Sequence, residues 1–185
     1  QLARVYFISG RYNEAISKIN QELLINPFNL RSYYIRGLVN GFSGRWEEAE
    51  KDFKVAVSSP FAKDINGWGV YNDLAWVLLR QRKYDEGAEV LKEAEGLFPD
   101  NVWIQNGLGN AYLGAGDLGL ALDHYIKALG KSDRLTAEDW LVAYPTHNPK
   151  TAEDGILQII KTIENNINIV NSKLSKVKLK DVREI

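Results

Sequence analysis

The sequence predicts a repeat protein, in which supersecondary units stack on one another instead of enclosing one closed core. Related blocks recur at Gly10–Ala15, Gly44–Ala49, Arg82–Gly87 and Gly116–Ala121, with offsets of 34, 38 and 34 residues. A fixed period of this size is typical of stacked units. With 45% apolar and 25% charged residues, the 185-residue chain also has the composition of an ordinary folded protein. The period favours binding over catalysis as the function.

Charge and missing residue types exclude several classes of protein. The formal net charge is -1 and the isoelectric point is near 6.2, whereas nucleic-acid binders usually carry a basic stripe. No apolar stretch approaches the roughly 20 residues that span a bilayer, and no signal-type segment opens the chain. Because cysteine is absent, disulfides, thiolate catalysis and cysteine-bound zinc are excluded. Since the chain begins with Gln1 and lacks methionine, we expect a fragment of a longer protein, whose localisation stays open.

Small and large residues recur at fixed places around each block. Two series of positions are small: Ala3, Gly37, Ala75, Gly109 and then Ala15, Ala49, Gly87, Ala121. One series is large and apolar: Ile19, Phe53, Leu91 and Tyr125. A further series has glycine where a helix would end, at Gly10, Gly44 and Gly116, with Arg82 as the exception. This register resembles that of the tetratricopeptide repeat, a 34-residue unit of helix A, tight turn and helix B.

The resemblance covers about residues 1–130 and implies an all-α fold. In this family four such units form a right-handed superhelix, or α-solenoid. The implied repeats span about residues 1–29, 30–61, 68–101 and 102–133, with an extra segment at 62–67. Stacking builds the core, because one unit cannot bury its apolar face alone. We expect Trp46, Phe53 and Tyr84 to lie in this core.

Residues 134–185 depart from the period and predict a helical cap. Thr136–Asp139 is a capping signal for a short helix with Trp140, and Pro145–Asn148 is typical of a turn. Pro149 suits the first turn of a second, long helix. Its apolar residues follow a heptad spacing at Ile156, Ile160, Ile163, Ile167, Val170, Leu174 and Val177.

Two interpretations of the long helix stay open. It covers the apolar face of the last repeat, or its second half extends as a coiled coil through an oligomer seam of Ile163, Ile167, Val170, Leu174 and Val177. The tail has Lys173, Lys176, Lys178, Lys180 and Arg183. Such a basic end is a solvated helix terminus, or it touches an anionic membrane or nucleic acid.

The resemblance also implies a ligand-binding surface, because helix A of each repeat lines a concave groove in this family. Carried onto this chain, the groove residues are Phe7, Arg31, Tyr34, Leu38, Phe42, Asn72, Trp76, Arg80, Trp103, Asn106 and Asn110. Exposed aromatic side chains commonly mark an interaction site. Asparagine both donates and accepts, so it can hold a peptide main chain. The alternative is that the C-terminal helix buries some aromatics, Trp103 above all.

One known use of such grooves is a carboxylate clamp for the acidic tails of Hsp70 and Hsp90 chaperones. The clamp needs lysine, asparagine and arginine at set positions, where this chain has Tyr34, Leu38, Gly69, Asp73 and Trp103. A chaperone-tail receptor of that kind is therefore not expected.

Residue patterns of enzymes are missing from the sequence. His124 and His147 are the two histidines, and no metalloprotease, phosphate-loop, nucleophile-elbow or dinucleotide motif is present. The acidic runs 47–50 and 85–86 start a helix, where carboxylates favour the helix dipole. We therefore expect no catalytic residue, no metal and no cofactor.

The sequence thus predicts a non-catalytic interaction module that holds an extended peptide or a helix of a partner protein. A self-assembling scaffold, joined through repeat ends or the C-terminal helix, is the first alternative. The second is a substrate-docking arm of a larger enzyme. The partner, the pathway and the compartment are not determined by these patterns.

Overall fold

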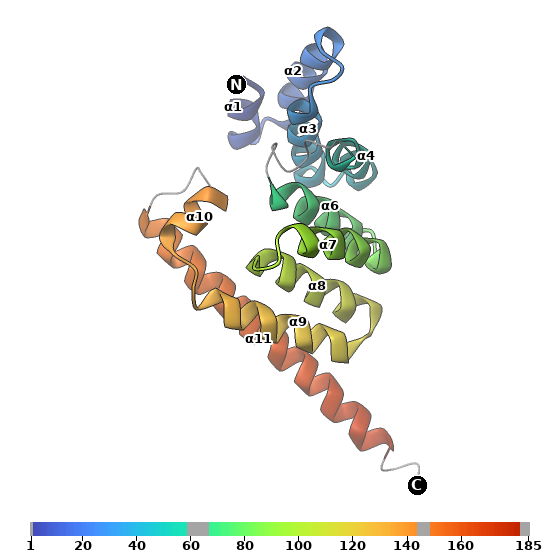
Figure 1. Cartoon of the computed structure of the whole chain (residues 1–185). Helices are drawn as coiled ribbons and strands as arrows, with labels where there is room; N and C mark the ends of the chain where they lie inside the picture. The colour runs from blue at the N-terminus through green and yellow to red at the C-terminus, as the bar shows by residue number, and fades with distance from the viewer. Residues whose placement is uncertain (1, 59–66, 144–148, 182–185) are drawn as a thin grey trace. The chain divides into compact units, whose positions relative to one another are not determined.

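The computed structural model describes residues 2–58, 67–143 and 149–181, and within these ranges every regular element is a helix (Figure 1). The all-α prediction is thereby confirmed. The chain divides into two compact units, Gln1–Val90 and Leu91–Ile185, which are described separately. The expected turn around Pro145 and His147 lies outside the described residues, as does most of the expected extra segment at 62–67.

The first unit consists of antiparallel helix pairs. Its helices are α1 (Leu2–Ile8), α2 (Tyr12–Ile25), α3 (Leu30–Phe42), α4 (Trp46–Val57), α6 (Trp68–Arg80) and the start of α7 (Tyr84–Leu97). Along this series α1 packs on α2, α2 on α3, α3 on α4 and α4 on α6. Each helix therefore contacts its neighbours in the chain, as expected of stacked units.

The second unit holds a further helix pair and the C-terminal helices. After the end of α7 it comprises α8 (Val102–Ala115), α9 (Leu118–Ser132), α10 (Ala137–Ala143) and α11 (Pro149–Asp181). Helix α8 packs on α9, and α11 packs on both α9 and α10 (Figure 1). No helix among the described residues is long and apolar enough to cross a membrane.

The same turn closes all four helix pairs. Gly10, Gly44 and Gly116 have φ values of 73°, 77° and 91°, and Arg82 has φ 61° although it carries a side chain. After the turn residue, the next N–H donates to a carbonyl five residues back, as from Arg45 to Asn40 at 2.9 Å. This pairing is the Schellman motif, whose left-handed residue is usually glycine. The predicted glycine turns are confirmed, and Arg82 shows that the geometry persists without glycine.

Small residues of one helix receive the large residue of the next. A Cβ atom on Gly37 would lie 2.7 Å from Cε1 of Phe53, and one on Gly109 would lie 2.5 Å from Cε1 of Tyr125. Phe53 and Tyr125 are fully buried. Of the expected core residues, Phe53 is confirmed. Trp46 and Tyr84 are only partly buried, because each stands at the first residue of its helix, beside the turn.

The C-terminal helices form as the capping and heptad signals predict. Thr136 Oγ1 accepts a hydrogen bond from the Asp139 N–H, and Asp139 Oδ2 accepts one from the Thr136 N–H. Ile163 and Val170 of α11 are fully buried, Ile167 and Leu174 are partly buried, and Val177 is exposed. Two of the five residues of the expected oligomer seam are thus already enclosed within the second unit. The side chains of Lys178, Lys180 and Arg183 lie outside what the structure describes.

Candidate functional site

Aromatic rings in the first unit form a continuous series, the aromatic ladder, made of Phe7, Phe42, Trp76 and Trp46. The ring centroids of Phe7 and Phe42 lie 5.5 Å apart, as do those of Phe42 and Trp76. Trp46 meets Trp76 edge-on, also at 5.5 Å. These spacings are those of favourable tilted and edge-to-face pairs. The structure therefore brings three of the expected groove aromatics together.

Helix ends position the ladder. Phe7 and Phe42 lie in the last turns of α1 and α3, and Trp46 begins α4 directly after the glycine turn. Trp76 fits against α3 because Gly41 has no side chain: a Cβ atom there would lie 2.7 Å from Cζ3 of the indole. Phe42 keeps 58% of its surface exposed, so the ladder has a face open to a ligand.

A cation closes one end of the ladder. The Arg80 guanidinium lies 5.1 Å from the centroid of the Trp46 ring, within the range of cation–π attraction. Arg80 comes from the last turn of α6, one turn after Trp76. The ladder therefore offers both an apolar surface and a positive charge to a ligand.

A partly buried carboxyl group, that of Asp73, lies beside another expected groove residue, Tyr34. The Tyr34 hydroxyl donates a 2.8 Å hydrogen bond to Oδ2 of Asp73, and the Tyr34 ring packs 5.9 Å from that of Phe53. Burial raises the pKa of Asp73 to about 7, and the hydrogen bond from Tyr34 offsets only part of this rise. Asp73 can therefore change charge near neutral pH.

The other expected groove residues of the first unit do not join the ladder. Arg31 is exposed in the first turn of α3. Leu38 is partly buried against the core around Phe53, and Asn72 is partly buried on α6. Leu38 is thus chiefly a packing residue, and Asn72 is partly exposed.

In the second unit the C-terminal helices contact two of the expected groove residues, Trp103 and Asn110. Trp103 is only 9% exposed, and its ring lies 6.0 Å from that of Trp140 on α10. Asn110 accepts hydrogen bonds from the Tyr125 hydroxyl at 2.7 Å and from the Asn166 amide of α11 at 3.4 Å. The structure thus places Trp103 under α10, which is the alternative that the sequence left open for this residue.

His124, the one histidine within the described residues, takes part in a polar chain inside the second unit. Its Nδ1 donates to Oε1 of Gln105 at 2.9 Å, and Gln105 Nε2 donates to Glu95 at 2.6 Å. The Tyr112 ring stacks on the imidazole at 5.4 Å. Burial lowers the pKa of His124, so the ring is neutral at pH 7. These contacts join α7, α8 and α9 and describe a structural histidine.

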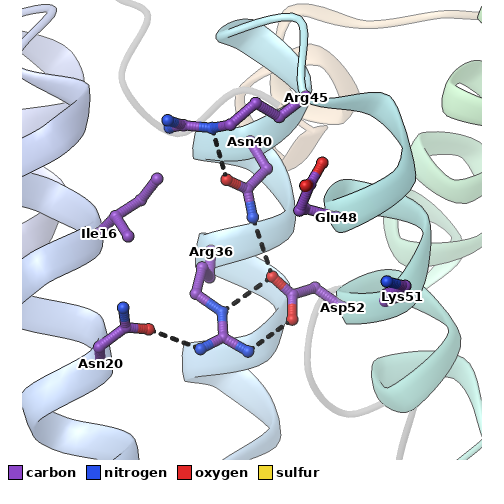
Figure 2. Close-up of a pocket in the computed structure, with 8 residues that line it drawn as sticks. All are labelled: Ile16, Asn20, Arg36, Asn40, Arg45, Glu48, Lys51 and Asp52. Atoms are coloured by element: carbon purple, nitrogen blue, oxygen red, sulfur yellow. Dashed lines mark hydrogen bonds and ion pairs between the residues drawn. The ribbon is translucent and has the colours of Figure 1, made fainter.

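A polar cleft of 390 Å³ lies between α2, α3 and α4 (Figure 2). Arg36 forms a two-bond pair with Asp52, at 2.9 and 2.7 Å, and also donates to Asn20 at 2.6 Å. Asn40 links Asp52 to Arg45, as Figure 2 shows. Because these groups satisfy one another, we assign the cleft to the joining of two helix pairs.

Sequence reasoning did not assign two residues, Trp46 and Asp73, to the candidate site. Trp46 was expected in the core, although its place directly after a glycine turn sets it beside the end of helix A. One feature of the sequence could have pointed to Asp73, because it is the one charged residue inside the apolar segment 68–79. Its partner Tyr34 is 39 residues away and could not be found from spacing.

Comparison with known proteins identifies the type of repeat. The family model described as the tetratricopeptide repeat matches residues 72–135. A search of the curated proteins gave no match.

Solved structures extend the likeness to most of the chain. MamA from Desulfovibrio magneticus RS-1, from residue 41 to its end, aligns with a TM-score of 0.64 and 18% identity, covering 89% of this chain and 92% of that one. YrrB, described as a TPR protein with an unusual peptide-binding site, aligns with a TM-score of 0.63 and 16% identity, covering 94% and 88%. At these identities the likeness establishes the fold, an α-solenoid of tetratricopeptide type.

Proposed function

Because the chain is built from tetratricopeptide repeats, we propose that it is a non-catalytic interaction module that holds a peptide or helix of a partner protein on the aromatic ladder. The carrying observation is the contact series Phe7–Phe42–Trp76, in which Phe42 is 58% exposed. Aromatic side chains are enriched among residues that dominate binding energy. YrrB, which is similar in fold, is described as having a peptide-binding site, and this supports the proposal.

The ladder is suited to binding because its rings are held before a ligand arrives. Trp76 is wedged between Phe42, Trp46 and the bare backbone at Gly41. Little side-chain entropy is then lost on binding, and this entropy is one of the costs that weaken association. Arg80, which lies beside Trp46, and the partly exposed residue Asn72 can supply polar contacts to the main chain of the ligand.

A peptide selected from a random phage-displayed library on the full chain tests this proposal. Fluorescence anisotropy then compares its affinity for the wild type, Phe42→Ala and Phe28→Ala. Phe28 is the matched control, because it is a phenylalanine of the same unit, 87% exposed and outside the ladder. We expect Phe42→Ala to weaken binding at least tenfold and Phe28→Ala to leave it unchanged. Equal binding by the wild type and Phe42→Ala would contradict the proposal.

A second candidate function is self-association through the face of the first helix. Val5 is 60% exposed, whereas the residues one and more periods on, Val39, Val77 and Ala111, are fully buried. An exposed apolar side chain on a helix surface can contribute to pairing with another copy of the chain. Since Ile163 and Val170 are already buried in the second unit, we place self-association here and not on α11.

Sedimentation equilibrium over a range of concentrations tests the second candidate. We expect an average mass above the monomer that falls to the monomer in Val5→Lys. Val55→Lys on α4 is the control, because Val55 is also exposed but lies on another helix. A monomer mass at every concentration would rule this candidate out.

A further inference from the structure

Within the second unit, helix α10 covers Trp103, one of the residues at which the repeat resemblance places the groove. Its Trp140 lies 6.0 Å from Trp103 between ring centroids, with the planes inclined by 46°. Trp103 stands in the first turn of α8 and is 9% exposed under this cover. On the other side Trp140 rests on α11: a Cβ atom on Gly155 would overlap the indole ring. Trp140 is therefore enclosed between a tryptophan and a bare helix backbone.

The helix that carries Trp140 is too short to persist without this contact. It has seven residues, Ala137–Ala143, whereas isolated helices below about 12–15 residues are marginal in water. Its N-terminus is supported locally by Thr136 and Asp139, whose side chains hydrogen bond to each other's backbone N–H or hydroxyl. The docking of Trp140 thus supplies much of what keeps α10 in place, and segments held in this way open at low free-energy cost.

One polar atom of the surface beside α10 has no hydrogen-bond partner among the described residues. Oδ1 of Asn106, one turn after Trp103 on α8, is buried and has no hydrogen-bond donor in the described structure. A buried acceptor without a partner is destabilising, because it has lost its hydrogen bonds to water and gained none in the folded chain. Asn110, a further turn along, is bonded by Tyr125 and Asn166. A ligand that brings an N–H group to Asn106 would therefore bind this surface better than α10 does.

We propose that Trp103 and Asn106 form a docking surface for a short helix that presents a tryptophan, and that α10 is its resident, exchangeable occupant. The surface receives a partner helix of the same chemistry when α10 is released. This rests on the proposed function only in that the partner is a protein. The chemistry of the partner is inferred from α10 itself. α10 places the Trp140 indole between Trp103 and Gly155, and its first turn carries a capping box.

The probe is a fluorescein-labelled synthetic peptide of residues 134–143, and the protein is the full chain. In the wild type Trp140 fills the site, so the peptide binds weakly. Trp140→Ala leaves an indole-sized space between Trp103 and Gly155, and we expect the peptide to bind at least tenfold more tightly by anisotropy. The same peptide carrying the Trp140→Ala change is the ligand control and does not bind.

The substitution Gly155→Ala distinguishes specific docking of the peptide from non-specific binding. Adding Gly155→Ala to the Trp140→Ala chain places a methyl group in the vacated space, and we expect tight binding to be lost. Alanine favours the helix over glycine, so α11 itself is not weakened. Should Trp140→Ala not fold by circular dichroism, Asp139→Ala replaces it, because it loosens α10 without touching the docking residues, and an affinity above that of the wild type is expected.

Two outcomes overturn the proposal: no gain in peptide binding by the folded, α10-loosened chain, or a gain that survives Gly155→Ala. Phe42→Ala keeps this test apart from that of the ladder. The residue 134–143 peptide binds equally with and without Phe42→Ala, whereas the phage-selected peptide does not. Either proposal can therefore fail without the other.

Discussion

The ring of Phe53 lies directly against Gly37, so that a Cβ atom on residue 37 would stand 2.7 Å from Cε1 of the ring. The two residues come from the paired helices α3 and α4. Tyr125 lies against Gly109 in the same way in the second unit. The contact of a small residue on one helix with a large residue on the next thus explains why small and large residues recur at fixed positions in each repeat.

Gly37→Ala should destabilise the chain although alanine is the better helix former. The added methyl overpacks a buried ring, which typically costs about 1–3 kcal/mol. Gly130→Ala is the control: a Cβ atom there meets nothing within 4 Å, so the free energy of unfolding should rise by about 0.5–1 kcal/mol. Urea unfolding followed by circular dichroism measures both. A gain in stability in both variants would mean that Phe53 does not set the residue at position 37.

Arg82→Gly should stabilise the third turn. Arg82 has φ 61°, a left-handed conformation that costs a residue with a side chain about 1–2 kcal/mol relative to glycine. Glycine gains more entropy in the unfolded chain, so we expect a net rise of about 0.5–1 kcal/mol in the free energy of unfolding. Gly44→Ala is the reciprocal change, because Gly44 has φ 77° and open space around it. The same urea titration should show Gly44→Ala to be less stable than the wild type. A less stable Arg82→Gly, or a more stable Gly44→Ala, would show that a side chain does not strain this left-handed turn.

Asp73→Asn should stabilise the chain at pH 8 and not at pH 4. Burial raises the pKa of Asp73 from 3.8 to about 7, so between these values the folded chain keeps a proton that the unfolded chain releases. Stability therefore falls as pH rises through this window and stays lowered above it. Asparagine mimics the protonated form and still accepts from Tyr34, so we expect a gain of about 1–3 kcal/mol at pH 8.

Thermal unfolding at pH 4 and pH 8 measures this difference. Asp100→Asn is the control, because the hydrogen bond from Lys131 lowers the pKa of Asp100 and no gain at high pH is expected. The same stability change for Asp73→Asn at both pH values would show that folding does not raise the pKa of Asp73.

Arg36→Met should destabilise the first unit more than the double change Arg36→Met, Asp52→Leu does. Asp52 is buried and receives two hydrogen bonds from Arg36 (Figure 2), so the single change leaves a buried carboxylate with only Asn40 as a donor. Removing one partner of a buried pair costs about 3–5 kcal/mol, whereas replacing both partners by apolar residues is often neutral. A double-mutant cycle from urea unfolding gives the coupling energy, and a double variant less stable than Arg36→Met would contradict this account.

The residues of the candidate site differ in how far their surroundings follow from the sequence. Phe7, Phe42 and Trp76 occupy positions that the repeat places on helix A, and the structure joins them through ring contacts. Trp103 occupies an equivalent kind of position and is covered by Trp140 instead. The difference comes from α10, a segment outside the period, whose place against α8 depends on packing and not on local pattern.

By itself, the sequence determined the helices, the four glycine-type turns and the contact of small with large residues, because each of these depends on residues close in the chain or on one repeated register. Only the tertiary structure decided that Tyr34 meets Asp73, that Trp46 joins the ladder and that Trp140 covers Trp103. Those contacts join side chains 30 to 39 residues apart. These contacts depend on how the helices pack. Helix packing is set by the burial of many side chains together, and no single sequence motif predicts it.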